Sequence, residues 1–324
     1  MDELTLFLST RNDALTPSTE ALTAGRAALL NRASEERSAA SPAARKRRLL
    51  PRLTWAAAGL TAAMGGVFVA GSVGLGAQSA QASELLQTTA AQTAQYTDLV
   101  PGAGEYLLSS THARWSTCGT TGTEETPGEP VCTPNDQFID VYMPADPTGL
   151  WVLDRDWGNA PIPDGIPEGP IRAENAAFYG PTSSWSLVDC SEIPLEGAAT
   201  YEWIDSQYAG GSASRDEDNF VRIADILRTG LVPAPQRAAL LDALALIPGV
   251  TSTENVANLD GVTGVAIGRN EPLRFGDRKE IIIDPSNGLV IGERTLSGVA
   301  LFGWESNNET ELTAIRTTVA STAP

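Results

Sequence analysis

The sequence predicts an α+β fold in which helices pack on one face of a curved antiparallel sheet, preceded by one membrane-spanning helix. Three observations predict it. A charge-free stretch between Leu53 and Ser83 divides the 324-residue chain. Short alternating segments separated by turns indicate strands both before and after a helical pair at 220–247. Strands followed by helices and then by an antiparallel meander are typical of the α+β class.

Residues 53–77 are the predicted transmembrane helix. At 1.5 Å per residue the segment is roughly 37 Å long, against a hydrocarbon core of about 30 Å. A basic cluster precedes it, and basic residues stay on the cytoplasmic side of a membrane. We therefore expect a single-pass cell-membrane protein with a cytoplasmic head (1–52), a membrane-proximal linker and helix (78–100), and an extracytoplasmic α+β domain (101–324). The cluster that sets this orientation consists of Arg45, Lys46, Arg47, Arg48 and Arg52.

Cleavage is the alternative to a retained anchor. Ala80-Gln81-Ala82 has the A-x-A pattern of signal-peptidase sites, and Arg47-Arg48 is half of a twin-arginine signal. Cleavage after Ala82 would release an exported domain. The apolar stretch, however, is longer than the 7–15 residues typical of a signal core.

The head and the membrane segment carry two further patterns. A helix predicted from Pro17 to about Arg37 has a narrow apolar stripe, which needs a membrane surface or a partner to complete it. In the membrane segment, small residues recur every four positions, a spacing that allows close helix packing and a homodimer. The residues of this small face are Ala62, Gly66, Ala70 and Gly74.

The domain outside the membrane is predicted element by element. Ser83 caps a helix that runs to about residue 96. Strands follow at 105–115, 137–142, 150–154 and 171–179. One helix around 220–227 stops at Gly230, and a second runs from Pro235 to the Pro248-Gly249 stop. The last strands are expected at 251–256, 264–267, 279–283 and 289–296, with a hairpin turn at 284–288.

Charge and cysteine usage agree with an exported domain. The formal net charge is −18, and because the head is net positive the remainder is more acidic still. Such a domain lacks the basic footprint that nucleic-acid binding requires. Cys118 and Cys132 flank a Gly/Thr/Glu/Pro-rich loop and are the predicted disulfide, while Cys190 is left over, either buried or in place of one partner.

No catalytic, cofactor-binding or metal-binding residue is predicted. The sequence has no G-x-S-x-G, no H-E-x-x-H, no phosphate loop and no dinucleotide fingerprint, and its single histidine is His112. The acidic clusters at 154–156 and 216–219 do not match calcium-loop spacing, and the second is expected to supply negative charge at the start of the helix from Phe220. The tryptophans at 115, 151, 157, 185 and 203 either belong to the core or line an apolar groove.

Several segments resemble a family of uncharacterised single-pass membrane proteins of actinobacteria. They are the run from Phe220 to Arg228, the stretch from Ala238 to Gly249, Asn258-Leu259-Asp260-Gly261, the stretch from Glu280 to Gly292, and the start Met1-Asp2-Glu3-Leu4. Members are often encoded near extracytoplasmic-function sigma factors, and their outer domains look like the open half-barrel of the LolA and RseB group. The resemblance implies a sensor or regulator whose concave sheet binds a lipid or a lipoprotein-like ligand. The head lacks the His/Cys zinc motif of many anti-sigma domains.

These observations favour a non-enzymatic membrane protein with an extracytoplasmic sensor domain. Its expected partners are a cytoplasmic sigma factor or other regulator and a lipid or lipoprotein ligand. The alternatives are an exported lipid carrier cleaved after Ala82 and a cell-wall enzyme with an unidentified carboxylate pair.

Overall fold

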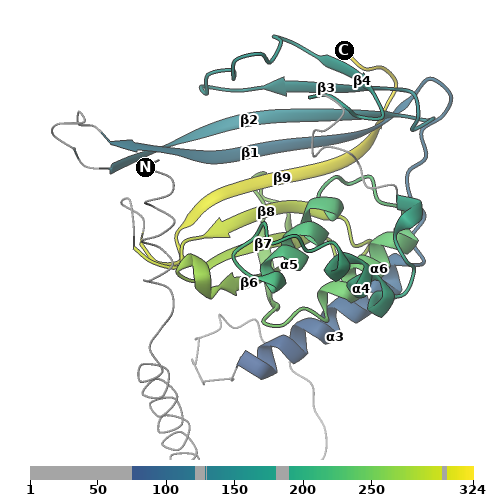
Figure 1. Ribbon diagram of the computed structural model, residues 1–324. Coiled ribbons are helices and arrows are strands. Elements are labelled where there is room, and N and C mark those ends of the chain that lie inside the picture. The colour runs from purple at the N-terminus through teal and green to yellow at the C-terminus, as the bar shows by residue number, and fades with distance from the viewer. Residues whose placement is uncertain (1–74, 121–127, 129, 180–189, 301–304) are drawn as a thin grey trace, which may run out of the picture. The chain divides into compact units, whose positions relative to one another are not determined.

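The computed structural model describes residues 75–120, 128, 130–179, 190–300 and 305–324, which all lie in one compact unit, Val69–Pro324 (Figure 1). Over these residues the chain has an α+β fold with four α-helices and one nine-stranded antiparallel sheet. The predicted fold class of this region is confirmed.

The sheet has the strand order β4-β3-β2-β1-β9-β8-β7-β6-β5. Two meanders, β1–β4 and β5–β8, are joined by the last strand β9, which pairs with β1 on one side and with β8 on the other. The strands are β1 Tyr106–Thr120, β2 Pro130–Pro144, β3 Leu150–Asp156, β4 Ile171–Glu174, β5 Thr251–Ala257, β6 Thr263–Glu271, β7 Asp277–Ile283, β8 Val290–Leu296 and β9 Glu309–Ala320.

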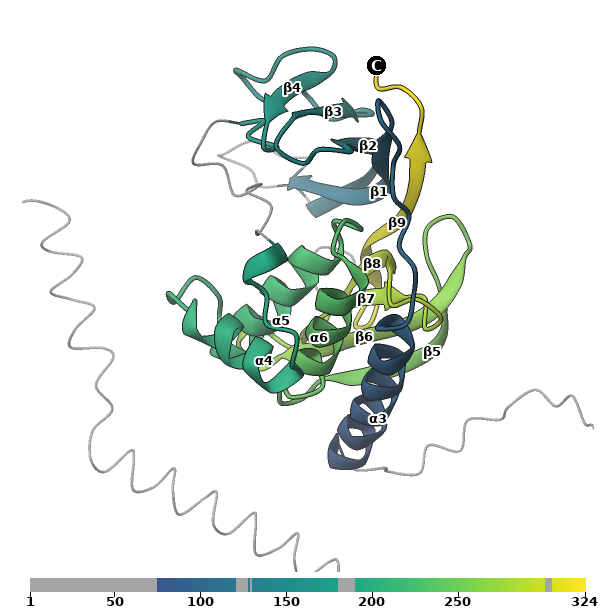
Figure 2. The same ribbon diagram turned by 90° about the vertical axis from the view of Figure 1, so that its right-hand side faces the viewer.

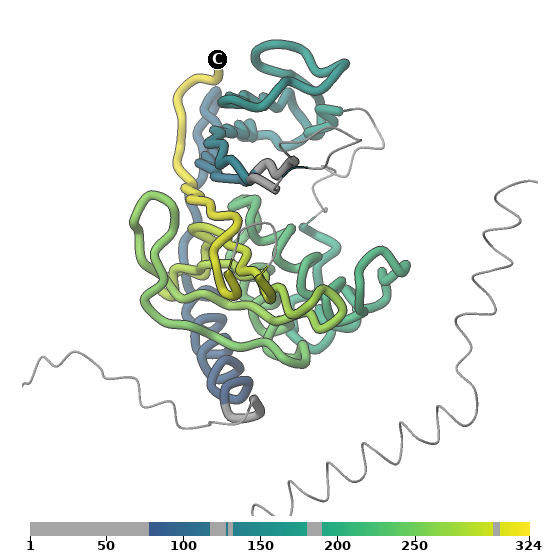
Figure 3. Tube along the Cα trace, turned by 90° about the vertical axis from the view of Figure 1, so that its left-hand side faces the viewer, coloured from purple at the N-terminus to yellow at the C-terminus, as the bar shows by residue number. Residues whose placement is uncertain are grey.

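The helices lie inside the bend of the sheet. Figure 2 shows the sheet nearly edge-on, with α4, α5 and α6 on its concave side and the β1–β4 half rising beyond them. α3 packs along α6 and against the edge strand β5, which Figure 3 shows from the opposite side. The helices are α3 Leu75–Thr93, α4 Gly197–Ser206, α5 Arg215–Leu227 and α6 Ala234–Leu244, with 3₁₀ turns at Cys190–Glu192 and Pro272–Arg274.

One large core joins the helices to the β5–β8 half of the sheet. Ile281 and Ile283 of β7 face the helices, and between them Ile282 faces a small cluster on the opposite side, because successive strand residues alternate faces. Phe220 and Ile223 of α5 are at most 2% exposed in this core. The β1–β4 half has a separate, smaller apolar cluster, so the helices fill only part of the concave face.

Local sequence signals explain where α5 begins and ends. The Ser214 hydroxyl accepts a hydrogen bond from the Glu217 amide (3.0 Å), and the Glu217 carboxylate accepts one from the Ala213 amide (2.7 Å). This arrangement is a variant of the capping box, in which the Glu217 carboxylate accepts from the amide one residue before the N-cap Ser214. After the helix, Gly230 adopts φ +67° and a Cβ there would lie 2.3 Å from Thr317 Oγ1 on β9. Only glycine allows this turn so close to the sheet.

A buried arginine fixes the chain that leaves α3. Arg237 of α6 is 1% exposed. It donates hydrogen bonds to the Asp98 carboxylate (2.9 Å) and to the carbonyl oxygens of Val232 (2.5 Å) and Asn287 (3.0 Å). The linker after α3, the start of α6 and the β7–β8 turn are therefore held by one side chain.

Most predicted elements are present, with several corrections. The helix predicted from Ser83 begins at Leu75, and the helix predicted from Phe220 begins at Arg215, so the acidic residues 216–219 form its first turns. The strand predicted at 171–179 ends at Glu174. α4 and β9 were not predicted at all.

The membrane-related predictions fall on residues that the structure does not describe. The orientation cluster (Arg45, Lys46, Arg47, Arg48 and Arg52), the small face (Ala62, Gly66, Ala70 and Gly74) and nearly all of the predicted span 53–77 lie before Leu75. Within the described part of the chain, no helix has the length and apolar character needed to cross a membrane.

Candidate ligand-binding cleft

A cleft of about 630 Å³ lies between the β1–β3 half of the sheet and the helix α5. It occupies the part of the concave face that the helices leave uncovered. Its lining comes from every layer around it: Ser109, Thr111, Trp115, Ile139, Val141, Arg155, Ala176, Phe178, Cys190, Gln207, Asp218, Val221, Arg222, Asp225, Ile226, Arg228, Thr229, Leu231, Val232, Glu293, Thr313 and Ile315.

The floor and one side of the cleft are apolar. Ile139 and Val141 stand two residues apart on β2 and therefore project from the same face of the sheet. Phe178 covers them from the segment after β4, and Val221 of α5 faces the same space. A volume of this size with an apolar floor is typical of a small-molecule site, and here half of the 22 lining residues are polar, six of them charged.

Arg155 on β3 is the polar feature of the sheet side. Its guanidinium lies 3.6 Å from the centroid of the Trp157 ring and 5.6 Å from that of Trp115. Its Nε and Nη2 donate to the Oε1 atom of Gln137 at 3.2 and 2.7 Å, and Tyr179 also hydrogen-bonds it. Burial lowers the pKa of Arg155, because desolvation disfavours the charged form. None of these partners is a carboxylate.

Ion pairs occupy the helix side of the cleft. Asp218 accepts from Arg222 at 3.0 Å, one turn along α5. Arg228 pairs with Asp225 at 3.2 Å and lies 3.7 Å from the Glu293 carboxylate of β8. Each acidic side chain of the cleft thus has an arginine beside it, and this wall carries little net charge.

Glu293 is the carboxylate most affected by its position. Burial raises its pKa, and the positive charge of Arg228 opposes the shift. The side chain is still 26% exposed, because it faces the open cleft while the protein surrounds it on the other sides. Protonation of Glu293 would leave Arg228 with Asp225 as its remaining acidic neighbour.

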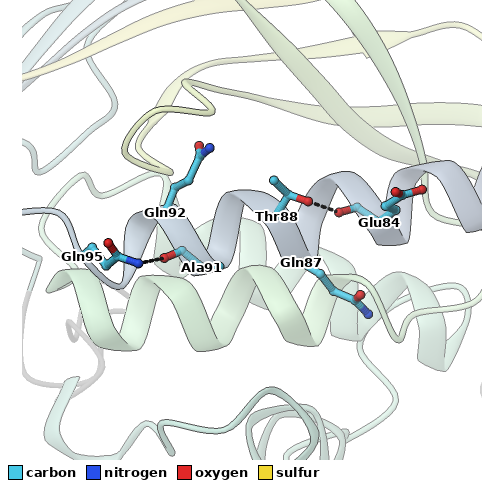
Figure 4. A pocket seen from close by; sticks show the side chains of 6 residues that line it. All are labelled: Glu84, Gln87, Thr88, Ala91, Gln92 and Gln95. Carbon is cyan, nitrogen blue, oxygen red and sulfur yellow. Dashed lines mark hydrogen bonds between the residues drawn. The ribbon is translucent and has the colours of Figure 1, made fainter.

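A second hollow lies along α3 and has a different character (Figure 4). Its six lining residues are exposed and mainly polar, five on α3 and one just after its end: Glu84, Gln87, Thr88, Ala91, Gln92 and Gln95. Two of its polar groups already bond within the helix, Thr88 Oγ1 to Glu84 O (2.9 Å) and Gln95 Nε2 to Ala91 O (3.4 Å). One helix cannot enclose a ligand, so we assign no site there.

The structure separates the residues that the sequence singled out. Cys118 and Cys132 are direct neighbours in the β1–β2 register, which is compatible with their predicted disulfide, and the bridge itself stays a prediction. Cys190 lines the cleft at the start of a 3₁₀ turn. His112 stacks on Phe138 (4.5 Å between ring centroids) and its Nδ1 lies 2.7 Å from Asp260.

The tryptophans divide between core and cleft. Trp151 is 3% exposed in the smaller apolar cluster, and Trp203 packs on the larger one. Trp115 lines the cleft, and Trp157 supports Arg155 beside it. Trp185 lies outside the described residues. The groove interpretation therefore holds for Trp115, and the core interpretation for Trp151 and Trp203.

Neither acidic cluster forms a cation site. Asp154 and Asp156 lie on the face of β3 opposite Arg155, since strand residues alternate, and 216–219 belong to α5. Over the described ranges, no group of three or more His, Cys, Asp or Glu side chains is placed to hold a metal ion.

The sequence singled out Trp115 and Cys190 of the cleft lining but not Arg155. Arg155 stood within an apparent acidic surface run, and its partners Gln137 and Trp115 are 18 and 40 positions away. The available signal was the alternation of β3, in which Trp151, Leu153 and Arg155 share a face.

The chain matches no protein-family model, no curated protein and no solved structure.

Proposed function

We propose that residues 75–324 form the extracytoplasmic binding domain of a non-enzymatic, single-pass membrane sensor, and that the cleft holds the apolar part of a lipid-like ligand. The observation that carries this proposal is the uncovered half of the concave sheet. The cleft of about 630 Å³ left there has an apolar floor of Ile139, Val141 and Phe178, each at most 9% exposed. The half-buried Trp115, Val221 and Leu231 also line it and offer apolar surface to a ligand. Apolar ligands bind such sites because apolar surface is removed from water.

The resemblance noted in the sequence supports the same proposal. An open half-barrel with helices against part of its concave face is the architecture expected of the LolA and RseB group, and a curved sheet partly filled by α5 and α6 agrees with that expectation. In this interpretation the ligand occupies the remaining part of the concavity.

The proposed signalling direction follows from the chain order. α3 follows the predicted membrane segment and packs on α6, and α6 is followed by the strands that carry Glu293 and Ile315 of the cleft. Ligand occupancy could then be transmitted through α3 to the head at 1–52, where a sigma factor or other regulator would bind. Failure of immobilised peptide 1–52 to capture any such regulator would refute this half of the proposal.

The exported-carrier alternative has an observation against it. Ala82, the last residue of the A-x-A pattern, is 0% exposed within α3. Cleavage after Ala82 would remove the first two turns of a helix that packs on α6. Sequencing the N-terminus of the mature protein in its membrane fraction decides between the two, and a start at Ser83 would overturn the retained anchor.

The enzyme alternative has less support. Each acidic side chain that lines the cleft, Asp218, Asp225 and Glu293, lies beside an arginine. Acid–base catalysis by a carboxylate pair needs two carboxyl groups that flank the reacting bond. Instead, these carboxylates form ion pairs with Arg222 and Arg228 on the helix side of the cleft.

Photo-crosslinking tests the ligand class directly. The full chain in phosphatidylcholine nanodiscs is exposed to a long-chain alcohol that carries a photoactivatable group, and the labelled peptides are identified by mass spectrometry. We expect label on the β2 peptide with Val141 and on the α5 peptide with Val221. Val221→Trp, which fills the cleft from a half-buried helix position, should suppress both. Label confined to the predicted span would refute the proposal.

A further inference from the structure

Arg155 differs from the other arginines that line the cleft. Arg222 and Arg228 each pair with carboxylates of α5. Within the described residues, Arg155 forms no ion pair, although the domain carries a large excess of acidic side chains. A half-buried guanidinium without a carboxylate, in so acidic a domain, needs a physical explanation.

The environment of Arg155 holds the guanidinium in place without neutralising it. Trp157 stacks on its face at 3.6 Å, and Gln137, which is 5% exposed, accepts from its Nε and Nη2. Stacking and a fixed acceptor orient a planar guanidinium, so less conformational entropy is lost when it binds a further group. Arginine carries five N–H donors. Gln137 and Tyr179 do not use all of them, which leaves donors for a ligand.

The position of Arg155 relative to the apolar floor is fixed by register. Ile139 lies directly opposite Arg155 across the β2–β3 ladder, and Val141 lies opposite Leu153. A chain that covers Ile139 and Val141 therefore brings its polar end beside Arg155. The neighbouring carboxylates Asp154 and Asp156 project from the other face of β3 and do not compete.

We propose that Arg155 is the anion-recognition residue of the cleft, and that the ligand is an amphiphile with an apolar chain and a carboxylate or phosphate headgroup. This inference rests on the proposed binding function and names its ligand class. Arginine usually binds either headgroup through charge-assisted, bidentate hydrogen bonds. The guanidinium of Arg155 is already partly removed from water in the folded protein, so ligand binding adds less of the desolvation cost on the protein side. The burial that lowers the pKa of Arg155 reflects that same desolvation.

The test compares headgroups on one chain. Photoactivatable probes of equal chain length, ending in a carboxylate, a phosphate or an alcohol, are titrated against the full chain in phosphatidylcholine nanodiscs at about pH 8, above the usual carboxyl pKa range. The quantity measured is the ratio of apparent affinities, anion to alcohol, from the labelled β2 and α5 peptides. We expect a ratio of about ten or more in the wild type, since hydrogen bonds to charged groups contribute that much even at a partly exposed site.

Two arginine variants decide the role of Arg155. Arg155→Gln should lower the anion-to-alcohol ratio to about one while leaving alcohol labelling within about twofold, because the apolar floor is unchanged. Arg155→Lys should give an intermediate ratio, since it keeps the charge but loses the planar stacking. Arg316→Gln is the matched control: it removes one exposed arginine from the other face of β9 and should leave the ratio unchanged.

The outcomes separate this inference from the proposed function. If alcohol and anions label the cleft equally in the wild type, or if Arg155→Gln keeps the wild-type ratio, Arg155 is not the anion-recognition residue, while the lipid-binding proposal stands. If no probe labels the cleft peptides, the proposed function itself is wrong. A preference for the carboxylate probe or for the phosphate probe identifies which headgroup Arg155 recognises.

Discussion

Replacing Arg237 tests how strongly one buried side chain holds the linker after α3 against α6 and the β7–β8 turn. In Arg237→Met the ion pair with Asp98 and the hydrogen bonds to the Val232 and Asn287 carbonyl oxygens are lost. The methionine retains part of the aliphatic volume, so the change is mainly electrostatic. Asp98 of the linker then keeps one hydrogen bond to α6, which its carboxylate accepts from the Ala234 amide (2.6 Å).

The magnitude follows from the burial of the two partners. Breaking a fully buried ion pair by removing one member costs about 3–5 kcal/mol. Asp98 is 32% exposed and regains water when it loses Arg237, which favours the lower end of that range, while two carbonyl groups add about 1 kcal/mol each. We therefore expect a loss of about 5 kcal/mol, or roughly 10–20 °C in Tm at about 2–4 °C per kcal/mol for a domain of this size.

Thermal unfolding of the full chain in mild detergent, followed by tryptophan fluorescence, measures this loss. Six of the seven tryptophans lie after residue 100, so the signal reports the α+β domain. Arg316→Met, at an exposed position of β9, is the control for removing a positive charge and should change Tm by at most about 1 °C. A loss below about 1 kcal/mol for Arg237→Met would show that the Arg237 hydrogen bonds do not stabilise the attachment of the linker after α3.

Three further predictions concern the cleft and the cysteines. Burial raises the pKa of Glu293 above the ordinary value of 4.5, so the wild-type protein loses stability as pH rises through the pKa of the folded state. Glu293→Gln does not titrate, and we expect its Tm in thermal unfolding to exceed that of the wild type near pH 7 but not below pH 4.5. If stability differs equally at both pH values, the carboxyl group does not titrate as described. Lengthening an alkyl probe should raise its affinity about fourfold per methylene, at about 0.8 kcal/mol each, until the 630 Å³ cleft is full; a flat series in the crosslinking titration would exclude an apolar site. Reduction should lower Tm by roughly 6–12 °C if Cys118 and Cys132 are bridged, since closing their loop contributes about 3 kcal/mol, and Cys118→Ser should be insensitive to the reductant.

The sequence predicted those parts of the fold whose local pattern agrees with their tertiary surroundings. β7 is an apolar run that ends in a Pro-Ser-Asn-Gly turn, and the helix ended by Gly230 has a regular apolar stripe. The turn marks the end of β7 although Glu280 to Ile283 are all buried, and the stripe of the helix matches the face that packs on the core. These local signals therefore report the two elements directly.

The missed elements lack that agreement. In β9 the consecutive residues Thr313, Ala314 and Ile315 are all buried, because this strand joins the two meanders and is covered on both faces there. A strand buried on both faces does not alternate. α4 begins after Glu196, whose side chain makes no capping hydrogen bond, so no start signal marks it.

The cleft was missed for a different reason, which is that it depends on register. Arg155 reaches the cleft because successive residues of β3 alternate between the two faces of the sheet. Its orientation, however, depends on Gln137 and Trp115, which β2 and β1 bring beside it. Nothing local to the Asp-Arg-Asp run indicates these neighbours. The surroundings of Arg155 in the cleft arise from the pairing of strands that are far apart in the sequence. Amino-acid composition indicates only that the domain is acidic.

The net negative charge of the domain leads to a final prediction about binding kinetics. An anionic amphiphile approaching this domain is repelled at long range by the excess of carboxylates, and salt screens such repulsion over about 8–10 Å at physiological ionic strength. Once bound, the headgroup contacts the half-buried Arg155, where screening is weaker. Raising the salt concentration should therefore increase the association rate of the anionic probe while changing its dissociation rate little. Stopped-flow measurement in nanodiscs checks this, with the alcohol probe as the salt-insensitive control. An association rate that falls with salt would mean that the approach is steered by positive charge, and that the acidic surface lies away from the entrance of the cleft.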